Sequence, residues 1–211
     1  MTKKKKINTI IFDLGGVLID WNPEYVYLKE FRGDRQYMDW FLNHICAWDW
    51  NVNQDAGYSL DKATKERIAM FPEYEDYIRM YYGRWEEMLG FAHEGTLKIL
   101  KELVDNPEYR VLALTNWSGE TFPIALKKFP WLQWFEGILV SGDEGTRKPF
   151  KDIYDLMLER YKINPSEAIF IDDSLKNVMG CEASGIKGVH FINSKTLAVQ
   201  LRSLGINCTI S

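Results

Sequence analysis

Residues 9–16 read TIIFDLGG, and this stretch decides the fold. Its first four residues are apolar or β-branched, and the run ends at Asp13, followed closely by Gly15 and Gly16. A short apolar run that is closed by glycines predicts a buried strand leading into a tight turn. The carboxylate of Asp13 is therefore expected at the carboxyl end of a buried strand.

Four further runs of the same kind follow in the second half of the chain, at residues 111–114, 137–140, 168–171 and 188–191. Helical patterns lie before, between and after them, at 94–105, 119–128, 150–161, 174–184 and 195–204. Short buried strands that alternate with helices predict a parallel sheet covered on both faces. We therefore predict an α/β fold, a doubly wound parallel sheet of the Rossmann-like class.

Residues 21–90 interrupt this alternation after the first strand. They contain almost no β-branched runs and are rich in Trp, Tyr, Met, Glu and Arg at helical spacing. Pro23 suits the start of one helix and Ser59 the N-cap of another. We predict a small all-helical cap of about four helices at 21–90, inserted into a core formed by 1–20 and 91–211.

The composition excludes several classes of function. Of the 211 residues 46% are apolar and 27% charged, the balance of a globular protein, and the net charge of −4 provides no basic field for nucleic acid. No stretch approaches the roughly 18 apolar residues that span a membrane. The three scattered cysteines, Cys46, Cys181 and Cys208, favour a reducing, cytoplasmic location over a disulfide framework. The sequence does not indicate an oligomeric state.

Polar side chains follow four of the five predicted strands. Ligands of open parallel sheets bind beyond the carboxyl ends of the strands, so we expect these side chains to converge on one edge. In chain order they are Asp13, Thr115 with Asn116, Lys148, and Asp172 with Asp173.

Three carboxylates close together repel one another unless a cation binds them. Oxygen ligands favour a hard cation, and Mg²⁺ suits one or two carboxylates together with a substrate phosphate. Lys148 adds a compact positive charge, and Thr115 and Asn116 supply donors for phosphoryl oxygens. Gly15 and Gly16 let the backbone turn tightly and come close to the substrate. An aspartate in this setting, such as Asp13, is able to attack phosphorus and form an aspartyl-phosphate that water then hydrolyses.

Four motifs in order resemble those of the haloacid dehalogenase superfamily. They are FDLGGVL at 12–18, LTN at 114–116, RKP at 147–149, and FIDDS at 170–174 with Asn177. The helical insert resembles the family's small cap. Within the superfamily, the chain looks most like sugar-phosphate phosphatases of the α-glucose-1-phosphatase type.

This resemblance assigns roles by position. It implies that Asp13 is the nucleophile, that Thr115 and Asn116 hold the phosphoryl group, and that Lys148 stabilises negative charge. It also implies that Mg²⁺ binds Asp13, the carbonyl of Gly15, and Asp172 or Asp173. The implied substrate is a small phosphorylated metabolite.

Gly15 departs from the family pattern, because most phosphatases of the family have a second aspartate there as general acid and base. Another group, such as Asp20, a cap residue or a metal-bound water, would then have to protonate the leaving group, or activity would be weak or absent. We interpret Asp20 as a turn residue. A good leaving group needs little protonation, so sugar 1-phosphates would suffer less than alkyl phosphates.

Two other functions remain open. A 2-haloacid dehalogenase shares the aspartate nucleophile, but it needs no metal and usually lacks an acidic pair like Asp172 and Asp173. A non-catalytic protein that binds a phosphorylated ligand would be consistent with Gly15. The motifs favour the phosphatase.

Overall fold

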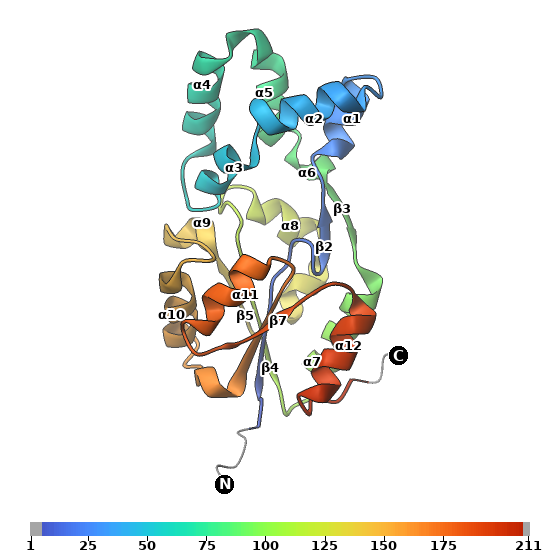
Figure 1. Ribbon diagram of the computed structural model, residues 1–211, viewed down its shortest axis with the longest axis vertical. Coiled ribbons are helices and arrows are strands. Elements are labelled where there is room, and N and C mark those ends of the chain that lie inside the picture. The colour runs from blue at the N-terminus through green and yellow to red at the C-terminus, as the bar shows by residue number, and fades with distance from the viewer. Residues whose placement is uncertain (1–5, 209–211) are drawn as a thin grey trace.

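Five parallel strands form the main sheet in the computed structural model, which describes residues 6–208 (Figure 1). In the spatial order β5-β4-β1-β6-β7, the strands are β5 (Gly137–Val140), β4 (Arg110–Thr115), β1 (Thr9–Phe12), β6 (Ala168–Asp172) and β7 (Lys187–His190). All five predicted strands are present, and the predicted α/β fold is confirmed. Because β1 pairs with β4 on one side and β6 on the other, the residue that follows β1 lies between the ends of both neighbours.

Helices cover both faces of this sheet (Figure 1). Successive side chains of a strand point to opposite faces, so the core divides into two clusters. Ile10 and Phe12 pack with α7, α8 and α12, whereas Ile11 packs with α10 and α11. The helices are α7 (Glu94–Asp105), α8 (Phe122–Lys128), α9 (Ser141–Glu144), α10 (Lys151–Arg160), α11 (Leu175–Glu182) and α12 (Ser194–Ser203), with 3₁₀ turns η2 (Pro130–Trp134) and η3 (Pro165–Glu167).

The helical insert stands beyond the carboxyl ends of the strands (Figure 1). It holds six helices, whereas the sequence predicted about four. Two of them, α3 with seven residues and α6 with four, are too short to show a clear helical period in the sequence. The elements are α1 (Glu24–Glu30), α2 (Arg35–His44), α3 (Trp48–Gln54), α4 (Leu60–Met70), η1 (Pro72–Tyr74), α5 (Glu75–Gly83) and α6 (Trp85–Met88). The predicted N-cap at Ser59 accepts a hydrogen bond from the backbone N–H of Lys62.

A two-stranded antiparallel sheet joins the insert to the main sheet. Its strands are β2 (Ile19–Trp21) and β3 (Leu89–Ala92), which straddle the ends of the region predicted to be all-helical. Both strands are short and most of their residues are partly exposed, so they leave no apolar run in the sequence. The division into a core at 1–20 and 91–211 and a cap at 21–90 stays a prediction.

Within residues 6–208, no helix combines the length and the apolar composition that crossing a membrane requires. The cytoplasmic location stays a prediction.

Candidate active site

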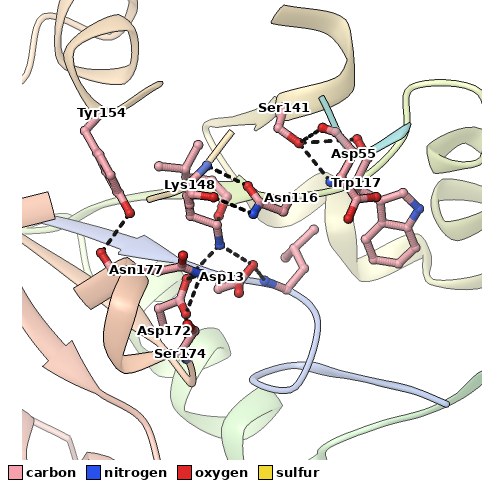
Figure 2. Close-up of polar contacts among 12 residues, drawn as sticks. Asp13, Asp55, Asn116, Trp117, Ser141, Lys148, Tyr154, Asp172, Ser174 and Asn177 are labelled. Carbon is pink, nitrogen blue, oxygen red and sulfur yellow. Dashed lines mark hydrogen bonds and ion pairs between the residues drawn. The ribbon is translucent and has the colours of Figure 1, made fainter. Parts of the chain in front are cut away.

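A buried ion-pair cluster lies at the carboxyl end of β1. The ammonium Nζ of Lys148 is 2.8 Å from Oδ1 of Asp13 and 2.7 Å from Oδ2 of Asp172, and it donates to the carbonyl of Leu114 at 3.1 Å. Figure 2 shows Lys148 between the two carboxylates. Lys148 is only 1% exposed, and these three acceptors satisfy the three donors of its ammonium.

Charge balance keeps Lys148 protonated. Burial alone would lower the pKa of its ammonium, but the charges of Asp13 and Asp172 and their hydrogen bonds raise the pKa above its ordinary value. The site therefore contains a permanent cation beside the predicted nucleophile.

The charge of Lys148 is not enough to bring the pKa of the Asp13 carboxyl back to its ordinary range. Asp13 is 7% exposed. Burial raises its pKa well above the usual range, Lys148 counteracts this only in part, and the charges of Asp172 and Asp173 raise it further. A second cation at this point would favour the ionised form that a nucleophile requires.

The two acids at the carboxyl end of β6 have different surroundings. Asp172 is fully buried, and its carboxylate accepts from the backbone N–H of Ser174 at 2.8 Å and from Nδ2 of Asn177 at 3.1 Å, in addition to Lys148. Asp173 is exposed and lies against Gly16, where a Cβ would be only 2.3 Å from its Oδ2. The carboxylate of Asp172 is thus held by the protein, while that of Asp173 faces the loop after β1.

The three carboxylates fit a hard divalent cation. One oxygen each from Asp13, Asp172 and Asp173 lies within 4.8 Å of the others. Although Asp173 is exposed overall, partial desolvation of its carboxyl and the charge of Asp172 raise its pKa. Oxygen ligands suit a hard cation such as Mg²⁺, which usually takes one or two carboxylates and a substrate phosphate. Of the residues described, 6–208, no other His, Cys, Asp or Glu side chains gather in this way.

Asn116 fastens the segment that carries Lys148. Its Nδ2 donates to the carbonyl of Lys148 at 3.0 Å, and its Oδ1 accepts from the Lys148 backbone N–H at 2.8 Å. Both polar groups of the side chain therefore hold the segment that carries Lys148. The amide nitrogen keeps a second hydrogen, and the phosphoryl contact of Asn116 stays a prediction. The position of Asn116 after a strand does not reveal which way its side chain turns. Thr115 is buried at the end of β4, and its phosphoryl contact stays a prediction.

Position 15 is open. A Cβ built on Gly15 would meet no atom within 4 Å. The predicted metal contact of the Gly15 carbonyl stays a prediction. Asp20 does not fill the gap, because it lies on β2, accepts a hydrogen bond from the hydroxyl of Tyr25 and lies against Gly90. Asp20 was interpreted as a turn residue, but it lies in a strand, and its contacts are with Tyr25 and Gly90.

Asp55, which follows α3, is a residue that the sequence did not single out. It is 6% exposed, and its carbonyl accepts a hydrogen bond from Oγ of Ser141, the residue that follows β5. Figure 2 shows this contact next to Trp117. No spacing or motif distinguishes Asp55 from an ordinary residue at a helix end, so only the packing of the insert reveals it.

The sequence profile described as "Haloacid dehalogenase-like hydrolase" matches residues 10–191, most of the chain. The chain belongs to this family. The resemblance seen in the four motifs is confirmed. Among curated proteins, the sesquiterpene phosphatase astK of Aspergillus oryzae is 26% identical over 199 residues, which cover 92% of this chain and 94% of that protein.

Solved structures of the family share the fold. The HAD family enzyme bt-2542 of Bacteroides thetaiotaomicron superposes with a TM-score of 0.71 at 22% identity, covering 94% of this chain and 100% of that one. Another structure of that enzyme is a complex with magnesium and inorganic phosphate. The L-2-haloacid dehalogenase of Xanthobacter autotrophicus superposes with a TM-score of 0.61 at 16% identity, covering 97% and 84%.

Proposed function

We propose that the chain is a Mg²⁺-dependent phosphatase that hydrolyses a small phosphorylated metabolite, with sugar phosphates as the first candidates, through an aspartyl-phosphate on Asp13. The observation that carries the proposal is the buried Lys148, which bridges Asp13 and Asp172 while Asp173 completes a three-carboxylate set. This combination provides a nucleophile, a fixed cation and oxygen ligands at one strand edge.

The hydrogen bonds of Asp13 indicate which of its oxygens attacks. Oδ1 accepts from the backbone N–H of Leu14 at 2.7 Å and contacts Lys148. The proposal therefore gives the attack on phosphorus to Oδ2, while Lys148 stabilises the charge that develops beside it. Phosphoryl transfer depends mainly on such positioning and charge stabilisation.

Asp173, Asp13 and the carbonyl of Gly15 are the proposed ligands of Mg²⁺, with Asp172 beside them. The bound ion neutralises the carboxylates and draws the phosphoryl oxygens into place. Asp173 is the preferred direct ligand of the acidic pair, because the carboxylate of Asp172 already accepts from Lys148, Ser174 and Asn177.

The comparisons support phosphoryl chemistry over dehalogenation. The relative astK is named a phosphatase, and bt-2542 was crystallised with magnesium and inorganic phosphate. Displacement of a halide from carbon requires no metal, so the acidic cluster would have no purpose in a dehalogenase. Chloride release from a 2-haloacid tests that alternative directly.

The test is phosphate release from p-nitrophenyl phosphate and a panel of sugar phosphates, with and without EDTA. Asp13→Asn removes the nucleophile, and Asp39→Asn is a matched control at an exposed carboxylate on α2. We expect turnover that requires Mg²⁺, disappears in Asp13→Asn and persists in Asp39→Asn. Turnover that survives in Asp13→Asn, or its absence from the unmodified protein, contradicts the proposal.

A further inference from the structure

A cavity of about 640 Å³ lies within the helical insert, between α3 and α4 (Figure 1). All the residues that line it come from positions 49–70, and none belongs to the carboxylate cluster around Asp13. Trp50, Ala63 and Met70 give the cavity apolar walls. A cavity of this size, with apolar walls and a few polar groups, suits a small organic molecule.

Arg67 brings an unpaired positive charge to this cavity. Its guanidinium lies over the ring of Trp50, 5.4 Å from the ring centroid, and over the ring of Phe71 at 5.5 Å. Within residues 6–208 the guanidinium forms no ion pair, and its buried Nε has no hydrogen-bond partner. Charged groups that are removed from water need a partner, and a guanidinium is best paired by an oxyanion. An anionic group of a ligand would supply that partner.

The amide of Gln54 adds an unpaired acceptor to the same cavity. Gln54 is 1% exposed, its Nε2 donates to the hydroxyl of Tyr82 at 2.9 Å, and that hydroxyl donates to Oδ1 of Asn51 at 2.9 Å. These two hydrogen bonds set the orientation of the amide and leave its Oε1 without a partner among the residues that the structure describes. A buried acceptor is unfavourable without a donor, so a ligand with an N–H or O–H group would be stabilised here.

Two carboxylates at the cavity decide the charge of the ligand. Glu66 is engaged, because the hydroxyl of Tyr58 donates to both of its oxygens at 2.8 Å. Asp49 is exposed and forms no ion pair within the described part of the chain. A ligand with only negative charge would be attracted by Arg67 but repelled by these acids. A ligand with one negative and one positive group complements both Arg67 and Asp49.

We propose that this cavity binds an amino acid with an apolar side chain. The carboxylate of the amino acid pairs with Arg67, and its ammonium group donates to Oε1 of Gln54 and faces Asp49. Its side chain packs against Trp50. The inference goes beyond the proposed phosphatase function, because it concerns a site formed by the insert alone.

The cavity lies in the part of the insert that rests on the core. The turn at 56–58 lines it, and a Cβ on Gly57 would lie only 2.6 Å from the carbonyl of Gly142 in α9. One position before this turn, the carbonyl of Asp55 accepts the hydrogen bond from Ser141. The bound amino acid therefore contacts the segment that joins the insert to the strand edge.

The test is isothermal titration calorimetry of the full chain with three related probes. Phenylalanine carries both charges, phenylpropionate lacks the ammonium group, and phenylethylamine lacks the carboxylate. EDTA is present throughout, so that no metal links a probe to the carboxylate cluster. We expect phenylalanine to bind about 10-fold or more tightly than either analogue, because each analogue lacks one charge-assisted hydrogen bond.

Two variants assign the contacts. Arg67→Gln should abolish the advantage of phenylalanine over phenylethylamine, and Asp49→Asn should reduce its advantage over phenylpropionate. Arg79→Gln is the matched control, at an exposed arginine that pairs with Glu75, and should change neither ratio. Asp49 is exposed, so its replacement leaves the packing of the insert intact. The ratio of two affinities measured on one variant does not depend on the fraction of folded protein.

Three results would overturn the inference. If neither phenylalanine nor leucine binds at millimolar concentration, Arg67 only stacks on its two rings. Equal affinities for phenylalanine and phenylpropionate identify a simple carboxylate site, without the predicted ammonium contact. An affinity for phenylalanine that Arg67→Gln leaves unchanged places the amino acid elsewhere. No phosphorylated substrate enters these measurements, so their failure leaves the proposed function standing, and failure of that function leaves this inference standing.

Discussion

Replacing Asp55 with asparagine changes how the free energy of unfolding depends on pH. Burial raises the pKa of the Asp55 carboxyl to about 7 in the folded protein, against an ordinary 3.8, so between these values the folded state binds the proton that the unfolded state has lost. Its contribution to stability is present below the lower value and disappears as the pH rises through the higher one. The folded and unfolded pKa values of Asp55 differ by about 3, and each pKa unit corresponds to about 1.4 kcal/mol, so the free energy of unfolding falls by on the order of 4 kcal/mol.

Asparagine keeps the shape of the side chain but does not titrate. Relative to the unmodified protein, Asp55→Asn should therefore gain about 4 kcal/mol of stability between about pH 4 and about pH 8. Urea unfolding of both proteins across this range, without Mg²⁺, measures the difference in their free energies of unfolding. For Asp39→Asn this difference should not change with pH. A flat difference for Asp55→Asn refutes the reasoning, because Asp55 would then ionise in the folded state as it does in water.

Three further variants probe the site. Lys148→Met leaves two buried carboxylates without their cation, so the free energy of unfolding by urea in EDTA should fall by about 3–5 kcal/mol. Added Mg²⁺ should restore part of this loss. An unchanged unfolding midpoint contradicts the prediction. Gly16→Ala strains a backbone with φ +72° and pushes its Cβ against the carboxylate of Asp173. The Mg²⁺ concentration for half-maximal turnover should therefore rise at least several-fold. An unchanged concentration would show that the Asp173 carboxylate is not a ligand. Gly15→Asp places a carboxyl in open space and should raise the turnover of an alkyl phosphate relative to p-nitrophenyl phosphate, which needs no proton to leave; an unchanged ratio argues against a missing acid there.

The strands of the main sheet could be predicted because they are buried on both faces. Each is a continuous run of apolar and β-branched residues such as Ile10 and Ile11, and such runs stand out from the helices between them. β2 and β3 lack this signal, since they are short and partly exposed. The number of helices in the insert was underestimated for a similar reason. A helix of four residues has little more than one turn, so its apolar residues cannot repeat at helical spacing.

The carboxylate cluster could be predicted because strand ends of a parallel sheet share one edge. Asp13 follows β1 and Asp172 ends the neighbouring strand β6, so topology alone brings them together. Side-chain direction beyond a strand end is set by the loop, which is why the sequence did not predict the hydrogen bonds of Asn116 to the Lys148 segment. Asp55 reaches the edge only through the packing of the insert on Ser141, and no local pattern encodes a contact across 86 residues.

The central claim is that Asp13 carries the phosphoryl group during turnover. The most direct measurement is to quench the enzyme with acid during steady-state hydrolysis, digest it with pepsin, and determine the mass of the peptides that contain Asp13. We predict that a fraction of these peptides carries one phosphoryl group and that Asp13→Asn shows none. Steady phosphate release with the phosphoryl group found on another residue, or retained in Asp13→Asn, would contradict the account.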